Sequence, residues 1–253
     1  MENITKNLVH KFGLVGKDIS YSFSRGYFLN KFKTENLPHH YVNYDLQSID
    51  ELRNIIGQTS NLKGLNVTIP YKEKVIPLLD KLDDRSSKIG AVNTIKISKN
   101  KKLIGYNTDY YGFKNSLKPH LKKYHKRALI LGTGGASKAI KYALKKLNIK
   151  FDFVSRSLKK ETKFLYSDLT INIVSQYNII INCTPIGTFP KIDKYPKIPY
   201  NGITDKHILY DLIYNPQETQ FLKFGKKRGA TTINGLEMLK LQAEESWKIW
   251  NAS

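Results

Sequence analysis

Short apolar runs alternate with helix-like segments along nearly the whole chain, and this alternation restricts the possible folds more than any other feature of the sequence. Strands that alternate with helices are typical of α/β proteins, in which consecutive strands lie largely parallel in a sheet. The runs with strand character are 12–15, 40–44, 62–69, 127–131, 151–155, 177–183, 208–212 and 231–233. We therefore expect an α/β fold with mostly parallel sheets.

Helical patterns and one hairpin fill the segments between these runs. The segments 91–97 and 102–107 predict a hairpin across a polar turn. Asp109 is expected to cap a helix that ends before Pro119. The other helical patterns cover 49–56, 71–79, 137–147, 217–228 and 236–250. A length of 253 residues suits one large or two small domains, and we expect two α/β units that meet near 105–120 and share a ligand-binding cleft.

The composition is strongly basic, since 42 Lys and Arg residues stand against 21 Asp and Glu and the formal net charge is +21. Such a charge attracts anionic ligands and can also hold nucleic acid. The basic residues are scattered over the whole length, and no block of like charge is long enough to form a nucleic-acid-binding arm. We interpret them as a lysine-rich solvated surface and expect no nucleic-acid partner.

Cys183 is the one cysteine of the chain, so no disulfide framework exists, which suits a reducing compartment. A lone cysteine can be a nucleophile, but Cys183 follows an apolar run and is interpreted as a buried structural thiol. The segment 1–10 has no apolar core of signal-peptide length, and no apolar run is long enough to span a membrane. We expect a cytoplasmic protein with no membrane partner and no metal site.

A glycine-rich loop stands between the strand-like run 127–131 and the helical pattern 137–147. Glycines permit a tight turn and a close approach of the backbone to a pyrophosphate, and the helix N-terminus adds N–H donors and the positive end of a dipole. Two adjacent glycines depart from the standard fingerprint, and a glycine turn without a ligand is the alternative, but the strand and helix on either side favour a nucleotide site. The residues expected at the phosphates are Gly132, Thr133, Gly134, Gly135 and Ala136.

The end of the next strand indicates which dinucleotide is bound. Enzymes that use NAD usually carry an acidic residue there, which binds the ribose hydroxyls. This chain has Ser155, Arg156, Ser157 and Lys160 in a segment without a carboxylate. A guanidinium can bind a 2′-phosphate through two hydrogen bonds and stack on adenine, although an ordinary basic turn is the alternative. The segment favours NADP as the cofactor.

Several short segments, in this order along the chain, resemble the shikimate dehydrogenase family. They are SFS at 22–24, NVTIPYK at 66–72, GAVNT at 90–94, GYNTD at 105–109, the glycine loop, SRS at 155–157, NCT at 182–184, YDLIYNP at 210–216 and NGLEMLKLQA at 234–243. Each segment alone is a weak signal, but so many in the right order are very unlike a chance match.

The resemblance implies a fold and an activity. The fold would have an N-terminal substrate-binding domain with a mostly parallel sheet, made of residues 1–104 and 236–253, and a Rossmann-like NADP-binding domain, made of residues 105–235. The active site would lie in the cleft between the two domains. The activity would be the reversible NADPH-dependent reduction of 3-dehydroshikimate to shikimate in aromatic amino acid biosynthesis, by a monomer or a homodimer.

The resemblance also assigns roles to individual residues. Lys72 and Asp109 match the family's catalytic pair: a lysine ammonium near the ketone can donate a proton and stabilise the developing oxyanion, and a neighbouring carboxylate can hold the lysine. Which of the two donates the proton stays open. The residues expected to bind the substrate are Ser22, Ser24, Asn66, Thr68, Lys72, Asn93, Asp109, Tyr214 and Gln242, and Thr184, Leu212 and Gly235 are expected to contact the cofactor.

The chain departs from the family's pattern without losing a reacting group. Arg25 stands where proline is usual, Ser155 stands where asparagine is common, and Glu237 and Lys240 are charged where small or apolar residues are frequent. Two alternatives stay open. One is a quinate/shikimate dehydrogenase that uses NAD, against which the paired serines and the missing acidic residue speak. The other is a non-catalytic basic α/β module that binds nucleic acid or a protein partner.

Overall fold

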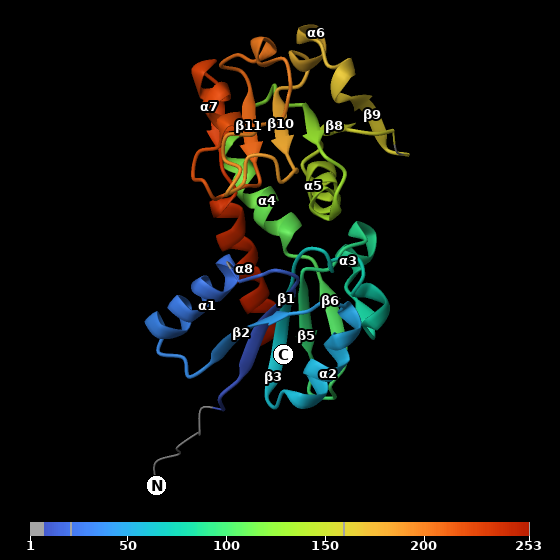
Figure 1. Ribbon diagram of the computed structural model, residues 1–253, viewed down its shortest axis with the longest axis vertical. Helices are drawn as coiled ribbons and strands as arrows, with labels where there is room; N and C mark the ends of the chain where they lie inside the picture. The colour runs from blue at the N-terminus through green and yellow to red at the C-terminus, as the bar shows by residue number, and fades with distance from the viewer. Residues whose placement is uncertain (1–7, 21, 159, 253) are drawn as a thin grey trace. The chain divides into compact units, whose positions relative to one another are not determined.

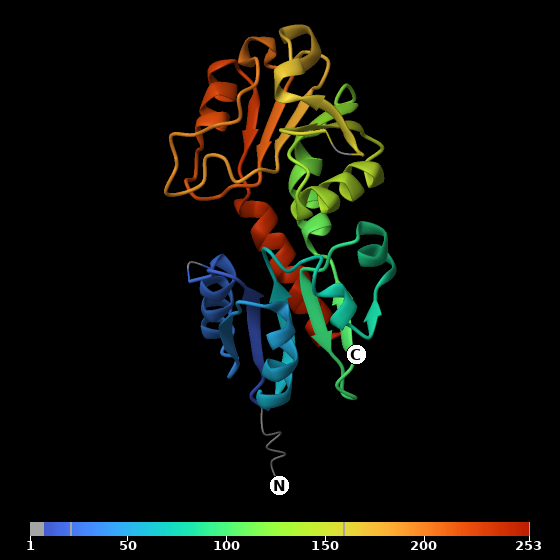
Figure 2. The same cartoon turned by 45° about the vertical axis from the view of Figure 1, so that its right-hand side comes forward.

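The computed structural model describes residues 8–20, 22–158 and 160–252, and Figures 1 and 2 draw it from two sides. The chain divides into two compact units. Unit 1 consists of Met1–Thr108 with Ala243–Ser253, and unit 2 consists of Asp109–Gln242. The sequence predicts a substrate-binding domain of residues 1–104 and 236–253 and a cofactor-binding domain of residues 105–235, and both roles stay predictions.

Unit 1 is built on a mixed sheet of six strands. Its elements are β1 Lys11–Gly16, α1 Phe23–Thr34, β2 His40–Asp45, the 3-10 turn Ile49–Glu51, α2 Leu52–Gln58, β3 Leu62–Val67, the 3-10 turn Ile76–Leu78, β4 Lys81–Leu82, α3 Asp84–Ile89, β5 Thr94–Ile97 and β6 Leu103–Tyr106. The strand order is β2-β1-β3-β5-β6-β4. All neighbours are parallel except β5, which is antiparallel to both β3 and β6, so the expected hairpin is confirmed.

The two faces of this sheet are covered by different helices. Alternate residues of β1 point to opposite faces, as in any strand. Phe12 belongs to a buried cluster with Phe28 of α1 and Trp250 of the last helix, α8 Leu236–Asn251, whereas Val15 belongs to a second cluster with Leu52 of α2. Figures 1 and 2 both draw the end of α8, in red, against β1 and β3.

Unit 2 is built on a sheet of six parallel strands. Its elements are α4 Asp109–Leu117, the 3-10 turn Lys118–His120, β7 Arg127–Leu131, α5 Gly135–Lys146, β8 Lys150–Ser155, β9 Thr162–Leu165, the 3-10 turn Tyr166–Asp168, α6 Ile171–Val174, β10 Ile179–Asn182, the 3-10 turn Tyr200–Gly202, β11 Ile208–Asp211, α7 Gln220–Lys227, β12 Thr231–Ile233 and the first part of α8. The strand order is β12-β11-β10-β7-β8-β9. The expectation of an α/β protein with mostly parallel sheets is confirmed.

The central strands of unit 2 are apolar at most positions because both faces of the sheet are buried. Leu129 and Ile180 pack on one face in a cluster with Phe221 of α7. On the other face, Phe113 of α4 contacts the ring of Tyr210 of β11 at 4.8 Å between centroids. Because these strands are packed on both faces, the loops that follow their carboxyl ends are held in fixed positions.

Two of the differences between the expected helices and the structure have a clear physical reason. The segment 71–79 forms turns and the short 3-10 helix Ile76–Leu78 instead of an α-helix. Pro77 explains this, since its nitrogen carries no hydrogen for the bond that an α-helix would need there. The helix α1 was not expected: its buried residues are Phe28 and Phe32 alone, and this narrow apolar stripe gives a weak helical pattern.

Candidate active site

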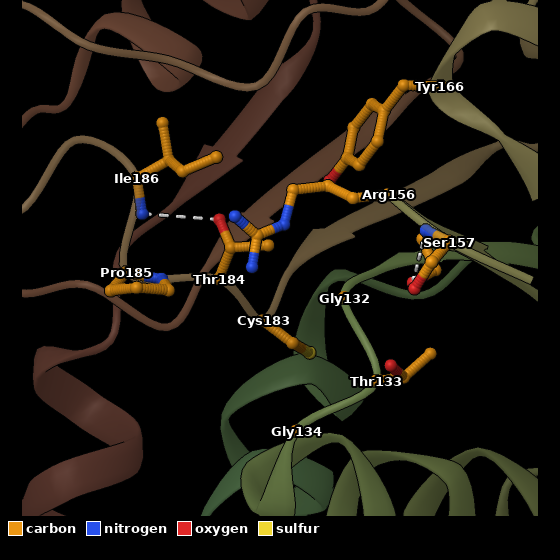
Figure 3. Close-up of a pocket in the computed structure, with 11 residues that line it drawn as sticks. Gly132, Thr133, Gly134, Arg156, Ser157, Tyr166, Cys183, Thr184, Pro185 and Ile186 are labelled. Atoms are coloured by element: carbon orange, nitrogen blue, oxygen red, sulfur yellow. Dashed lines mark hydrogen bonds between the residues drawn. The ribbon is translucent and has the colours of Figure 1, made fainter. Parts of the chain in front are cut away.

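A pocket opens at the carboxyl edge of the parallel sheet of unit 2, with a volume of about 330 Å³ (Figure 3). The residues that line it follow β7, β8, β9 and β10, whose carboxyl ends lie at one edge because these strands are parallel. β7 stands between β8 and β10, where the order of the sheet reverses direction, and ligands of such sheets bind at this switch point. The lining residues are Gly132, Thr133, Gly134, Ser155, Arg156, Ser157, Tyr166, Cys183, Thr184, Pro185 and Ile186.

The glycine loop forms the floor of this pocket. Gly132 has a φ of 99°, and a Cβ atom there would lie 2.8 Å from Cγ2 of Thr184, so the position admits only glycine without strain. Gly134 precedes α5 in an extended conformation, and a Cβ on it would meet no atom within 4 Å. The first turn of α5 contains no acidic residue. The loop and the helix N-terminus therefore suit a phosphate group.

The end of β8 adds a cation beside the phosphate loop. Ser155 is buried at the end of the strand, and Arg156 and Ser157 are exposed directly after it. None of the described residues that line the pocket is an aspartate or glutamate. A donor-rich wall with one guanidinium fits a phosphorylated ribose better than a free diol, which an acidic residue normally binds. The lining thus fits NADP.

Thr184 is held in place by a buried network behind the pocket. Its backbone N–H and its hydroxyl donate to Oδ1 of Asn182 at 3.0 and 2.7 Å. The amide of Asn182 donates to Oδ1 of Asp211 at 3.0 Å, and the hydroxyl of Thr219 donates to Oδ2 of the same carboxylate at 2.6 Å. The strand ends of β10 and β11 are thereby tied together, and this fixes one wall of the pocket.

Cys183 lines the pocket but lacks the character of a nucleophile. Burial and the nearby carboxylate of Asp211 raise the pKa of the Cys183 thiol. A thiol is nucleophilic as the thiolate, which is scarce when the pKa lies this far above neutral pH. The interpretation of Cys183 as a structural thiol fits these surroundings.

Other residues that the sequence assigned to the cofactor lie outside the pocket lining. Gly135 and Ala136 form the start of α5, and Lys160 is exposed beyond the end of β8. Leu212 and Gly235 lie together, because a Cβ on Gly235 would meet the carbonyl oxygen of Leu212 at 2.1 Å. Their roles toward the cofactor stay predictions.

Four residues that line the pocket were not predicted as cofactor contacts, and one of them is Cys183. Pro185 and Ile186 continue the NCT segment, so their position next to Thr184 could have been inferred from it. Tyr166 follows β9, a strand that the sequence pattern did not reveal. Tyr166 lies beside Arg156 because β8 pairs with β9.

In unit 1, several of the predicted substrate residues gather at one edge of the sheet. Asn66 and Thr68 stand at the carboxyl end of β3, which is parallel to β1. Asn93 precedes β5, which runs antiparallel to β3, so the start of β5 lies at the same edge. Thr68 fixes the turn that follows, since its N–H donates to the carbonyl of Val15 at 2.9 Å.

The two asparagines belong to a buried hydrogen-bond network. The hydroxyl of Tyr41 donates to Oδ1 of Asn66 at 2.7 Å, and the amide of Asn66 donates to the hydroxyl of Ser246 at 3.1 Å. The amide of Asn93 donates to the hydroxyl of Thr108 at 2.9 Å, and its Oδ1 accepts from the N–H of Thr108 at 2.6 Å. Both side chains are therefore rigid, and Tyr41 is a member of the network that the sequence did not predict.

The remaining predicted residues of unit 1 lie in the segments after β1 and β3. Ser22 caps α1, since its hydroxyl accepts from the N–H of Arg25 at 3.3 Å. Ser24, half-buried in the first turn of α1, hydrogen-bonds with Tyr41, whose pKa burial raises well above its usual value. Lys72 is half-buried in the turn after β3, and its carbonyl accepts from the N–H of Val92 at 2.7 Å. Lys72 is thus tied to the same sheet edge.

Unit 2 carries the other three predicted substrate residues. Asp109, only 6% exposed, is the first residue of α4. Gln242 is buried in α8, where its amide donates to the carbonyl of Leu239 at 3.0 Å. Gly112 of α4 allows close packing there, since a Cβ on it would lie 3.2 Å from Cβ of Gln242. Tyr214 is half-buried after β11.

Residues 8–20, 22–158 and 160–252 lack two further features. No helix among them has the length and apolarity that crossing a bilayer requires. The same part of the chain contains no group of three or more His, Cys, Asp or Glu side chains arranged to hold a metal ion.

The strand order of unit 2, its glycine turn and its basic strand end define a dinucleotide-binding enzyme of the Rossmann class. The family model for the shikimate dehydrogenase substrate binding domain matches residues 14–95, within unit 1. The shikimate dehydrogenase (NADP(+)) of Methanosphaera stadtmanae is 40% identical over 94% of this chain and 90% of its own length. The chain belongs to the shikimate dehydrogenase family.

Solved structures agree with this assignment. A shikimate dehydrogenase in complex with NADP+ is 35% identical and has a TM-score of 0.84, over 96% of this chain and 90% of that one. The shikimate 5-dehydrogenase of Thermus thermophilus, in complex with NADP(H) and shikimate, is 25% identical with a TM-score of 0.84, over 96% and 93%. The similarity covers both units.

Proposed function

We propose that this protein reduces 3-dehydroshikimate to shikimate with NADPH, reversibly, as a step of aromatic amino acid biosynthesis. The observation that carries the proposal is the pocket at the switch point of the parallel sheet, where a glycine turn, a helix N-terminus and Arg156 meet with no carboxylate among the described lining residues. The family membership of the chain supplies the reaction class.

The chemistry divides between the cofactor and the chain. The bound cofactor supplies the hydride that reaches the ring ketone. Lys72 donates a proton to the ketone oxygen or stabilises its developing charge, and Asp109 holds the lysine and binds a ring hydroxyl.

The polar side chains of unit 1 position the substrate. Ser22 and Ser24 donate to its carboxylate, while Asn66, Thr68 and Asn93 bind the ring hydroxyls. Rigid amides favour discrimination, because an analogue that lacks a hydroxyl leaves a buried donor without a partner at a cost of about 1–3 kcal/mol. Tyr214 and Gln242 complete the set from unit 2, and the protein works in the cytoplasm as a monomer or homodimer without a nucleic-acid partner.

The experiment that tests the proposal measures cofactor reduction with four substrate pairs, shikimate or quinate with NADP+ or NAD+. The expected result is a kcat/KM that is highest for shikimate with NADP+. A preference for quinate or NAD+ would favour the related NAD-dependent quinate/shikimate dehydrogenase. The absence of all four activities, together with a steeply salt-dependent affinity for DNA or RNA, would favour a non-catalytic basic module.

A further inference from the structure

One buried polar atom among the described residues that line the cofactor pocket has no hydrogen-bond partner. The hydroxyl oxygen of Tyr166 is covered from solvent and makes no hydrogen bond with any of the described residues. A buried hydroxyl without a partner is unfavourable, so native proteins rarely keep one unless a ligand or a water satisfies it. The ring itself lines the pocket (Figure 3).

The fold explains why Tyr166 stands beside Arg156. Arg156 is the first residue after β8, and Tyr166 is the first residue after β9. These strands pair in parallel, with Ser155 opposite Leu165, so the two residues leave the sheet at neighbouring points of one edge. Burial raises the pKa of Tyr166 to about 12, although the guanidinium of Arg156 lowers it. The hydroxyl is therefore protonated at neutral pH and can act as a donor.

The groups around this point are suited to one kind of ligand. Arg156 can only donate hydrogen bonds, the hydroxyls of Tyr166 and Ser157 can donate, and none of the described lining residues carries a carboxylate. A cluster of hydrogen-bond donors with no carboxylate beside it fits an anion that has several oxygen atoms. Arg156 is exposed, so its side chain can move and uncover the tyrosine when such an anion enters.

We propose that Tyr166 is a specificity-determining residue, whose hydroxyl donates to the 2′-phosphate of NADP and so strengthens the preference for NADP over NAD. The proposal rests on the proposed function, because it takes NADP as the cofactor of the pocket. The hydroxyl of Tyr166 would be a second donor beside Arg156, supplied by the neighbouring strand. Tyr166 belongs to none of the sequence motifs of the site.

The test compares Tyr166→Phe with the unsubstituted protein by calorimetric titration with NADP+ and with NAD+. Tyr166→Phe should raise the Kd for NADP+ about tenfold, since a hydrogen bond to a charged group is lost, and should change the Kd for NAD+ less than about twofold. Arg156→Ala is the positive control and should show the same selectivity with a larger loss. Equal weakening of both cofactors would overturn the proposal, and so would an unchanged Kd for NADP+.

A matched tyrosine separates a binding role from a structural one. Tyr200 is also half-buried, but its hydroxyl donates to the carbonyl of Pro196 at 2.8 Å and does not line the cofactor pocket. Tyr200→Phe should therefore lower the thermal stability of the ligand-free protein and leave both Kd values unchanged. Tyr166→Phe should leave that stability unchanged or raise it, because a hydroxyl without a partner is removed. A destabilised Tyr166→Phe with normal affinity for NADP+ would show a purely structural role and sink the proposal.

Failure of this inference is distinguishable from failure of the proposed function. If the unsubstituted protein does not reduce NADP+ with shikimate, the proposed function fails. If it does, and Tyr166→Phe keeps the ratio of the two Kd values, the inference alone fails.

Discussion

A buried carboxylate lies directly behind the cofactor pocket and is the ionisable group whose burial has the clearest consequence. Asp211 is 0% exposed, and it accepts hydrogen bonds from Asn182, Thr219 and the N–H of Ile213. These bonds favour the ionised form, but burial outweighs them and raises the pKa of Asp211 to about 6. In the unfolded chain the pKa of an aspartate is about 3.9. The folded state therefore binds this proton more tightly than the unfolded state does.

The sign of the pH dependence follows from that difference. The contribution of Asp211 to stability is fully present below about pH 4 and is lost as the pH rises to about 6, by roughly 2–3 kcal/mol. The substitution Asp211→Asn keeps the shape of the side chain but removes its ionisable group. It should therefore remove this loss of stability at rising pH. The free energy of unfolding in urea, measured from pH 4 to 7 for both proteins, checks it. The free energy of unfolding of Asp211→Asn, relative to that of the unsubstituted protein, should increase from pH 4 to 7. A difference that stays constant over this range would contradict the raised pKa.

The proposed acid–base role of Lys72 gives the second prediction at this scale. Lys72→Ala should lower kcat about 10²–10⁴-fold, as expected for the loss of a general acid, with only a modest change in the KM for shikimate. Lys74→Ala is the matched control, because Lys74 is an exposed lysine of the same segment and should leave kcat unchanged. Near-normal turnover of a folded Lys72→Ala protein would exclude the acid–base assignment.

Sequence predicts individual site residues where the signal is local. Gly132 and Arg156 follow strands with buried, mostly apolar ends, so their place at the carboxyl edge could be inferred from the chain itself. Tyr166 and Tyr41 could not be inferred in this way. Tyr166 reaches the pocket through the pairing of β8 with β9, and Tyr41 reaches Asn66 across the sheet of unit 1. Contacts that depend on strand pairing leave no pattern in the neighbouring residues.

At the scale of elements, the residue types in a segment decide how well its sequence predicts it. The strands β7 and β12 begin and end where the pattern predicts, because a fully apolar or β-branched run has clear limits. The short edge strand β9 was missed, since its residues are only half-buried or exposed. β9 contains Lys163 and only one β-branched residue, Thr162, so it lacks the β-branched run that marks β12 at the other edge of the sheet.

The helix α8 shows how one element completes a unit from a distant part of the chain. Trp250 near its end is 0% exposed and contacts Phe12 and Phe28, with ring centroids 4.9 and 5.2 Å apart. Its Nε1 donates to the carbonyl of Ile95 at 3.0 Å. A Cβ on Gly64 of β3 would lie 2.2 Å from the same ring, so this glycine makes room for the indole. The core of unit 1 is therefore closed by the last helix.

Removal of this indole should be costly. Trp250→Ala leaves a cavity among aromatic rings and removes the hydrogen bond of the indole to the carbonyl of Ile95, and we expect a loss of about 3–5 kcal/mol in the free energy of unfolding. Urea titration followed by circular dichroism measures it. Lys248→Ala, at an exposed position of the same helix, is the control and should change the stability by less than about 0.5 kcal/mol. A loss below about 1 kcal/mol for Trp250→Ala would mean that α8 does not close the core.

The molecule as a whole carries a formal net charge of +21, while both the cofactor and the substrate of the proposed reaction are anions. A field of this sign raises the rate at which anions meet the protein, and salt removes that gain. Exposed lysines remote from the pocket contribute to the field. Lys145 and Lys146 lie at the end of α5 opposite Gly135, and a helix of 12 residues is about 18 Å long. They are too distant to contact the phosphates, so their effect on binding is electrostatic alone.

The substitutions Lys145→Glu and Lys146→Glu, made together, should raise the KM for NADP+ roughly fivefold at an ionic strength of about 0.01 M, where the screening length of ~30 Å exceeds that distance. The same variant should match the unsubstituted protein above about 0.1 M, where the screening length falls to ~10 Å. Replacement of both lysines by glutamine should give an intermediate KM at low salt, because it removes half as much charge. Steady-state kinetics across this range of salt decides the matter. A KM that does not respond at low salt would show that the charge acts only on groups in contact with it, and that the basic surface has no part in attracting the cofactor.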